Sequence, residues 1–204
     1  MKGINTEHRI LMAAEEVFLD KGFSAAKTTE IARKAEVNHA LVHYYFRSKE
    51  NLFETVFINK YKQVLVVFTE AVDGEKPYLE RLKQIMTAQF ELFIGSSKMP
   101  LFIVNEFLNN PQRLNFLKRK ISMFPQEILI RFERQTNEAI EQGIIRTIDT
   151  KELLFSVFSL LFSVFINRSF SQYIFNWDGM DYPEFAKKRE NEIIDFVLKS
   201  LRPL

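Results

Sequence analysis

The hydrophobic pattern of the first fifty residues predicts three short helices in succession. In the first of them, apolar side chains recur at the spacing of one helical face, and acidic residues fall on the opposite face. The apolar residues are Ile10, Leu11, Ala14, Val17 and Phe18. Asn5 or Thr6 can cap the start of this helix, and Lys21 and Gly22 mark its end.

A second and a third helix follow with little chain between them. Thr28 or Thr29 can open the second helix, whose buried side chains are small enough for another helix to lie close. Residues 35–37 predict a tight turn, and Asn38 is a good cap for a third helix. The two helices and the turn have the outline of a helix-turn-helix.

The third helix has an inward face and an outward face of unusual chemistry. Val42, Tyr45 and Phe46 are spaced at i, i+3 and i+4, so we expect them to face the core. The outward residues are Ala40, Leu41, His43 and Tyr44, with His39 at the exposed amino end. Such a face predicts a contact surface. In a helix-turn-helix the second helix enters the DNA major groove and the flanking elements contact phosphates.

The segment after the third helix completes a pattern that resembles the TetR family of bacterial transcriptional regulators. The family's I-L-x-A-A-x-x-x-F, G-F, I-A-x-x-A-x-V and aromatic-F-x-S-K-E-x-L runs are met in order over about the first fifty residues. The resemblance implies phosphate contacts from Thr28, His43, Tyr44 and Lys49, and base-edge contacts from Thr29, His39, Ala40 and Leu41. The helix cap Asn38 completes the predicted DNA-binding set.

Three positions depart from the family pattern. Glu36 stands in the turn where the family usually has glycine, and in a left-handed conformation a non-glycine residue costs roughly 1 kcal/mol. Lys27 replaces a hydroxyl common at the start of the second helix, and His43 replaces a tyrosine common in the third. The last two predict a different pattern of phosphate contacts.

Beyond residue 50 the pattern stays helical and becomes rich in phenylalanine. A fourth helix continues to Val72, and further helices are expected over residues 77–95, 100–108, 111–142 with a bend at Pro125, 150–173 and 183–201. The sequence therefore predicts an all-α fold of about nine helices. A helix-turn-helix DNA-binding head would occupy residues 1–50, and a helical ligand-binding and dimerisation domain residues 51–204.

Residues 153–166 are apolar on nearly every side. This run of 14 residues is shorter than the roughly 18–20 that span a bilayer, and charged residues bracket it, so we expect no membrane segment. The same helix of a second copy of the chain can bury such a surface, which predicts a homodimer. The predicted interface residues are Phe155, Phe158, Phe162 and Phe165, with Ile193, Phe196 and Val197 of the last helix.

The middle helices contain large side chains that could line an apolar cavity. The predicted ligand-binding residues are Tyr61, Met86, Gln89, Phe90, Phe93, Phe102, Asn105, Met123 and Phe124, with the amides as polar anchors. An aromatic stripe at helical spacing is more often plain core. The resemblance, rather than the composition, implies that this domain binds a small inducer.

Composition sets broad limits. In 204 residues, 47% hydrophobic and 26% charged, the chain has the balance of a soluble globular protein. The first fifty residues contain eight Lys or Arg and seven Asp or Glu, so DNA binding would depend on how charges are arranged and not on net charge. The chain has no cysteine, which rules out disulfides and thiolate metal sites. With no apolar signal core at the amino terminus, we expect a cytoplasmic protein.

Other chemistries find little support in the sequence. His39 and His43 are four residues apart, a spacing that metals accept, but no third ligand is evident, so we expect no metal. The basic run at residues 113–120 fits a solvated helix face. Because no phosphate loop, GxSxG, HExxH or carboxylate pair tied to a histidine is present, we expect neither an enzyme nor a bound cofactor.

Two functions remain open. The first is a dimeric, sequence-specific regulator, a repressor that a small apolar or aromatic inducer releases from a palindromic double-stranded DNA operator. The second is an all-α small-molecule binding or catalytic protein whose head has no DNA role. Salt-dependent binding to DNA distinguishes them.

Overall fold

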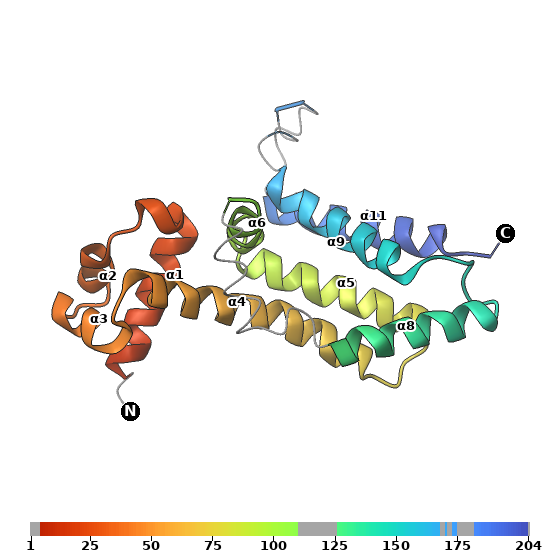
Figure 1. Cartoon of the computed structure of the whole chain (residues 1–204). Coiled ribbons are helices and arrows are strands. Elements are labelled where there is room, and N and C mark those ends of the chain that lie inside the picture. Colours follow the sequence, from red (N-terminus) through yellow and green to blue (C-terminus); the bar gives the residue numbers. More distant parts are fainter. Residues whose placement is uncertain (1–4, 110–125, 168–169, 171–172, 175–181, 204) are drawn as a thin grey trace. The chain divides into compact units, whose positions relative to one another are not determined.

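The computed structural model describes residues 5–109, 126–167, 170, 173–174 and 182–203 (Figure 1). Within these residues the chain forms nine helices and no strand, which confirms the all-α prediction. The helices are α1 (Thr6–Ala25), α2 (Thr28–Lys34), α3 (His39–Phe46), α4 (Lys49–Val72), α5 (Tyr78–Gly95), α6 (Met99–Asn109), α8 (Gln126–Glu141), α9 (Thr150–Ile166) and α11 (Tyr182–Ser200).

The chain divides into two compact units. Unit 1 consists of Met1–Lys62 and Leu101–Ile121, and unit 2 consists of Gln63–Pro100 and Ser122–Leu204. The division falls inside α4, whereas the sequence placed a boundary at residue 50. The helical pattern continues without a break through α4, so nothing local marks where one unit ends.

In unit 1, helices α1, α2 and α3 pack together into the predicted three-helix head (Figure 1). The backbone of α1 leaves helical geometry at Gly22 (φ 69°, ψ 178°), where the sequence predicted the helix end. Glycine suits this left-handed φ because it has no Cβ. Rings then join α1 to α4: Phe53 lies edge-on to Phe18 with centroids 5.0 Å apart and to Phe23 at 5.1 Å.

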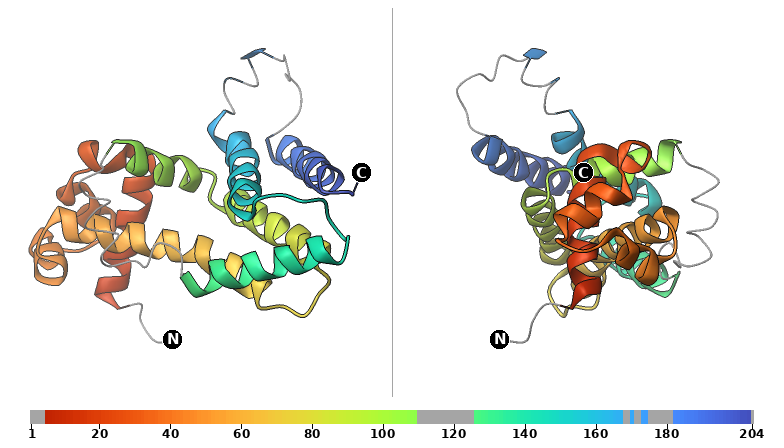
Figure 2. Two further views of the ribbon diagram at one scale, coloured as in Figure 1. Left: turned by 45° about the vertical axis from the view of Figure 1, so that its right-hand side comes forward. Right: turned by 90° about the vertical axis from the view of Figure 1, so that its left-hand side faces the viewer.

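In unit 2, α5 is the central helix, and it packs against α8, α9 and α11. Figures 1 and 2 show α9 and α11 running beside each other. The buried face of α5 consists of Tyr78, Leu82, Ile85, Met86, Gln89, Phe90 and Phe93. Rings connect this face to α9, with centroids 5.1 Å apart for Phe90 and Phe165 and 4.8 Å for Phe93 and Phe162.

Helices α5, α6, α9 and α11 begin within one residue of their predicted starts, whereas α8 and α9 are described over shorter spans than predicted. Asp149 caps α9 by accepting hydrogen bonds from the backbone N–H groups of Lys151 (2.8 Å) and Glu152 (3.0 Å). The helix ends at Ile166 rather than near residue 173. The predicted stretch before α8, including Met123 and Phe124, lies outside the described residues. No helix in the described ranges is long and apolar enough to cross a membrane.

Candidate nucleic-acid interface

The turn between α2 and α3 is a helix cap built on a left-handed glutamate. The N–H of Val37 donates to the carbonyl of Ala32 (3.0 Å), and the N–H of Glu36 donates to the carbonyl of Arg33 (3.2 Å). This pair of bonds is the Schellman arrangement, whose C′ residue is usually glycine. Glu36 occupies that position with φ 53°, so the turn keeps the left-handed geometry at a cost of roughly 1 kcal/mol.

Helix α3 begins at the predicted cap and buries two side chains. The Asn38 side chain accepts a hydrogen bond from the backbone N–H of Ala40 (2.9 Å), and Val42 and Phe46 are buried. The prediction that Tyr45 faces inward is wrong, since its side chain is 36% exposed and its ring lies against Tyr44. Residues 42 and 46 are only 40° apart on a helix, whereas residue 45 is about 100° from 46 and outside the covered arc.

The outward face of α3 carries most of the predicted contact residues. Ala40, Leu41, His43 and Tyr44 are exposed, and Tyr44 at 66% is the most open aromatic side chain of α3. The rings of His39 and His43 meet edge to face with centroids 5.5 Å apart. The helix thus presents rings and one leucine to solvent, as its sequence predicted.

The first residues of α2 and α3 are joined by one hydrogen bond. The Thr28 hydroxyl oxygen lies 2.9 Å from Nε2 of His39, and both side chains are half-buried. Thr29, the neighbouring candidate, is exposed. The structure therefore brings together one predicted phosphate-contacting residue and one predicted base-reading residue, an association that sequence spacing did not indicate.

Lys49 is held at the start of α4. Its ammonium lies 4.4 Å from the centre of the Phe23 ring and donates to the carbonyl of Ser24 at 3.4 Å. Ser48 caps α4 by accepting a hydrogen bond from the N–H of Asn51 (3.1 Å). These contacts fix the amino end of α4, where the helix dipole favours a negative group.

Two basic residues were not among the predicted contacts but lie at the ends of the two helices. Lys27 directly precedes α2 and Arg47 directly follows α3, and both are exposed. Neither forms an ion pair with any of the described residues, whereas Lys21 is 2.7 Å from Glu30 and Lys34 is paired with Glu16. For Lys27 the sequence signal was its replacement of a hydroxyl common at the start of the second helix, and for Arg47 it was only the position at a helix end.

The predicted ligand-binding residues are divided between the units. Met86, Gln89, Phe90 and Phe93 line the buried face of α5 in unit 2. In unit 1, Tyr61 stacks on Phe57 and Phe102 packs on Phe53, while Asn105 is exposed. Burial raises the pKa of the Tyr61 hydroxyl to about 12. Each unit therefore contains only part of the predicted set.

Gln89 is the unusual member of the buried face of α5. Its side chain is 0% exposed, and neither the amide nitrogen nor the amide oxygen has a hydrogen-bond partner. An unpaired polar group in a core costs about 1–3 kcal/mol. Phe90 and Phe93, its neighbours along this face, offer no compensating polar atom. This amide is the strongest candidate for contact with the polar group of a ligand.

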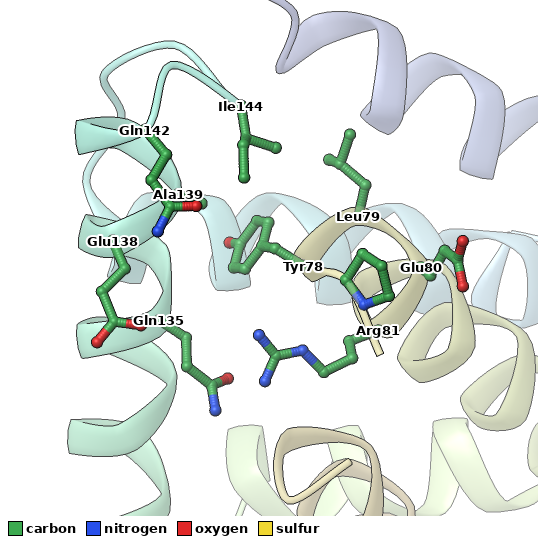
Figure 3. A pocket seen from close by; sticks show the side chains of 10 residues that line it. Tyr78, Leu79, Glu80, Arg81, Gln135, Glu138, Ala139, Gln142 and Ile144 are labelled. Atoms are coloured by element: carbon green, nitrogen blue, oxygen red, sulfur yellow. The ribbon is translucent and has the colours of Figure 1, made fainter. Parts of the chain in front are cut away.

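Unit 2 also has a cavity of about 590 Å³ between the first turn of α5 and the end of α8 (Figure 3). The lining residues are Pro77, Tyr78, Leu79, Glu80, Arg81, Gln135, Glu138, Ala139, Gln142 and Ile144. In Figure 3 the Arg81 guanidinium points toward Gln135, and its Nε is buried without a partner. The Tyr78 hydroxyl is 3.0 Å from that of Thr136, and burial raises the Tyr78 pKa. None of the predicted ligand-binding residues lines this cavity.

The predicted dimer residues divide into an outward and an inward set. Phe155 of α9 and Phe196 of α11 are exposed, at 72% and 64%. Phe158 and Phe162 are half-buried, and they contact Phe68 and Phe93. The buried members are Phe165, Ile193 and Val197, which pack within the core of a single chain. Among the residues that the structure describes, no three potential metal ligands come together.

Comparisons with known proteins agree with the geometry of the head. Residues 10–56 match the family model described as bacterial regulatory proteins, tetR family. The transcriptional regulator UidR of Escherichia coli K12 is 29% identical over 115 residues, which is 56% of this chain and 58% of UidR. The fatty acid metabolism regulator protein of Bacillus subtilis is 25% identical over 138 residues, 68% of this chain and 70% of that protein.

Solved structures extend the similarity over the whole chain. A bacterial regulatory protein in the tetR family from Rhodococcus RHA1 superposes with a TM-score of 0.74 at 18% identity, covering 98% of this chain and 99% of that one. At this identity the likeness concerns the fold, and the family model and the curated relatives add the sequence pattern of the head. The chain belongs to the TetR family of bacterial transcriptional regulators.

Proposed function

We propose that this protein is a homodimeric, sequence-specific DNA-binding regulator that acts as a repressor. The outward face of α3 carries the proposal: exposed rings and a leucine follow a capped amino end, which one hydrogen bond joins to α2. Helix α3 would lie in the major groove, with His39, Ala40 and Leu41 at base edges. Thr28, Tyr44, Lys49, Lys27 and Arg47 would contact phosphates.

Dimerisation would use the outward residues of α9 and α11. Phe155 and Phe196 are exposed on two helices that pack side by side, which supports an isologous interface formed with the same helices of a second copy. A two-fold dimer would present two recognition helices about 34 Å apart, the spacing of half-sites in a palindromic operator. The buried residues Phe165, Ile193 and Val197 would support this interface from behind.

A small apolar inducer would act through unit 2. The fully buried amide of Gln89, surrounded along α5 by Met86, Phe90 and Phe93, offers one polar anchor in an apolar region. One relative is named a fatty acid metabolism regulator protein, so acyl compounds are the first ligands to test. Such a ligand would lower operator affinity only if it binds one head arrangement more tightly than the other.

A salt series separates this function from the alternative, an all-α small-molecule binding protein whose head has no DNA role. A duplex selected from a randomised pool is titrated with the full chain at about 50 and 200 mM salt. A head that neutralises several phosphates should lose roughly a thousandfold or more in affinity over this range. No duplex binding, or binding indifferent to salt, would favour the alternative.

A further inference from the structure

The hydrogen bond between Thr28 and His39 constrains which protons each side chain can offer to DNA. The hydroxyl oxygen and Nε2 are 2.9 Å apart, and either atom can be the donor. A threonine hydroxyl has a single O–H, and a neutral imidazole has a single N–H. The direction of this one bond therefore decides whether Nδ1 of His39 is a donor or an acceptor.

The position of Thr28 determines which of the two side chains donates the Thr28–His39 hydrogen bond in the DNA complex. Thr28 is the first residue of α2, the helix of the pair that crosses the DNA backbone, and its side chain is half-exposed. A phosphate oxygen can only accept hydrogen bonds. When the Thr28 O–H donates to a phosphate, its oxygen can only accept from His39, and Nε2 must then carry the imidazole proton.

The remaining nitrogen of His39 is free to meet a base. Nδ1 has no hydrogen bond with any of the described residues, and His39 is the first residue of α3, where a recognition helix reaches base edges. The His43 ring, edge-on at 5.5 Å, restricts rotation of the His39 ring. Two contacts on different sides thus hold Nδ1 in one orientation.

We propose that Thr28 and His39 form a relay in which a phosphate contact sets the base that is read. With Nε2–H donating to Thr28, Nδ1 is an acceptor and selects a base amino group in the major groove, N6 of adenine or N4 of cytosine. Guanine and thymine place acceptors there and would repel the Nδ1 lone pair. Thr28 is a positioning residue in this scheme. The inference rests on the proposed DNA-binding function.

Base analogues test the relay directly. The operator is selected with the wild-type chain from a randomised duplex pool. In one half-site, each adenine is replaced in turn by purine, which lacks the N6 amino group, and each cytosine by 2-pyrimidinone, which lacks the N4 amino group. Affinities are measured by fluorescence anisotropy at one salt concentration. One of these replacements should weaken wild-type binding roughly tenfold and weaken His39→Ala by less than about twofold.

Variants of Thr28 separate positioning from a simple phosphate contact. Thr28→Val removes the hydroxyl with little change of shape and should abolish the analogue penalty, while Thr28→Ser keeps the hydroxyl and should retain it. Thr147→Val is the matched control, because Thr147 is an exposed threonine of unit 2 outside the proposed DNA contacts, and it should retain the penalty. A uniform loss of affinity in Thr28→Val, with the analogue penalty intact, would reduce Thr28 to a phosphate contact and overturn the relay.

Two further results would also overturn it. If the penalty that depends on His39 appears with 7-deazaguanine instead, then Nδ1 donates and the assigned tautomer is wrong. If no adenine or cytosine analogue separates wild type from His39→Ala, His39 does not read an amino group. These failures differ from failure of the proposed function, in which the wild-type chain binds no duplex in the pool even at low salt.

Discussion

Units 1 and 2 differ in where their polar side chains of interest lie: at the surface in unit 1 and in the core in unit 2. In unit 1, the head carries polar side chains at its surface and joins them to neighbours, as Thr28 is joined to His39 and Asn38 to the backbone of Ala40. In unit 2, Gln89 is enclosed in the core with its amide unpaired. A surface whose polar groups are already oriented suits a large rigid partner such as a duplex, whereas an enclosed, unpaired amide suits a small molecule.

The largest expected effect comes from the aromatic core of unit 2. Phe93→Ala should lower the free energy of unfolding by about 3–5 kcal/mol, because the ring is fully buried and contacts both Phe162 and Phe165. Urea denaturation followed by circular dichroism measures the change. Ile130→Ala on α8 is the control, since the exposed Ile130 side chain should cost less than about 1 kcal/mol in the same chain.

The next largest effect is expected at the surface of unit 2, at the proposed dimer interface. Phe155→Asp combined with Phe196→Asp should weaken self-association by roughly a hundredfold, since charges would be buried at the proposed interface. Sedimentation velocity measures the subunit state, and circular dichroism checks that the helices remain. A folded double variant that stays dimeric at all concentrations would show that the interface lies elsewhere.

Gln89 tests whether an unpaired polar group in unit 2 is kept for a ligand. Gln89→Leu should raise the free energy of unfolding by about 1–3 kcal/mol by removing the unpaired amide. The same variant should bind the operator normally, but acyl ligands should no longer release it from the operator. Denaturation curves measure the free energy of unfolding, and titrations with acyl ligands measure release from the operator. A more stable chain that still responds fully to the inducer would make Gln89 a structural residue only.

The smallest expected effects belong to individual contacts of the head. Tyr44→Ala and Arg47→Ala should each weaken binding to all duplexes by about 1 kcal/mol, and each should leave base preference unchanged. Anisotropy titrations against the operator and an unrelated duplex measure this. Arg134→Ala on α8 of unit 2 is the control for Arg47→Ala, because it removes the same charge away from the head and should leave DNA binding unchanged. A shift in base preference with Tyr44→Ala would instead assign that ring to a base.

The head could be predicted from sequence in unusual detail because its signals are local. The cap at Asn38 and the break in α1 at Gly22 are determined by side-chain capping and backbone freedom within a few residues, and both are observed. Tyr45 could not be placed in the same way. Its orientation depends on which arc of α3 its neighbours cover, and helical spacing does not contain that information.

Unit 2 was predictable as helices but not as surfaces. The aromatic residues of α9 have the same character in sequence, yet Phe155 is exposed, Phe158 touches Phe68 and Phe165 is buried. A helix that is apolar on every side carries no amphipathic signal to say which side faces the core. The cavity beside Arg81 was equally hidden, since its walls come from α5 and α8, which are far apart in the chain.

The sequence by itself determined the helices, their caps, the turn at Glu36 and the chemistry of the face that α3 shows to solvent. These depend on hydrogen bonds and side-chain spacing within one or two turns. Only the tertiary structure decided that Thr28 meets His39, that Gln89 is sealed without a partner, and that Phe155 rather than Phe165 faces outward. Such pairings arise between helices, where burial depends on residues distant in the chain that no local pattern records.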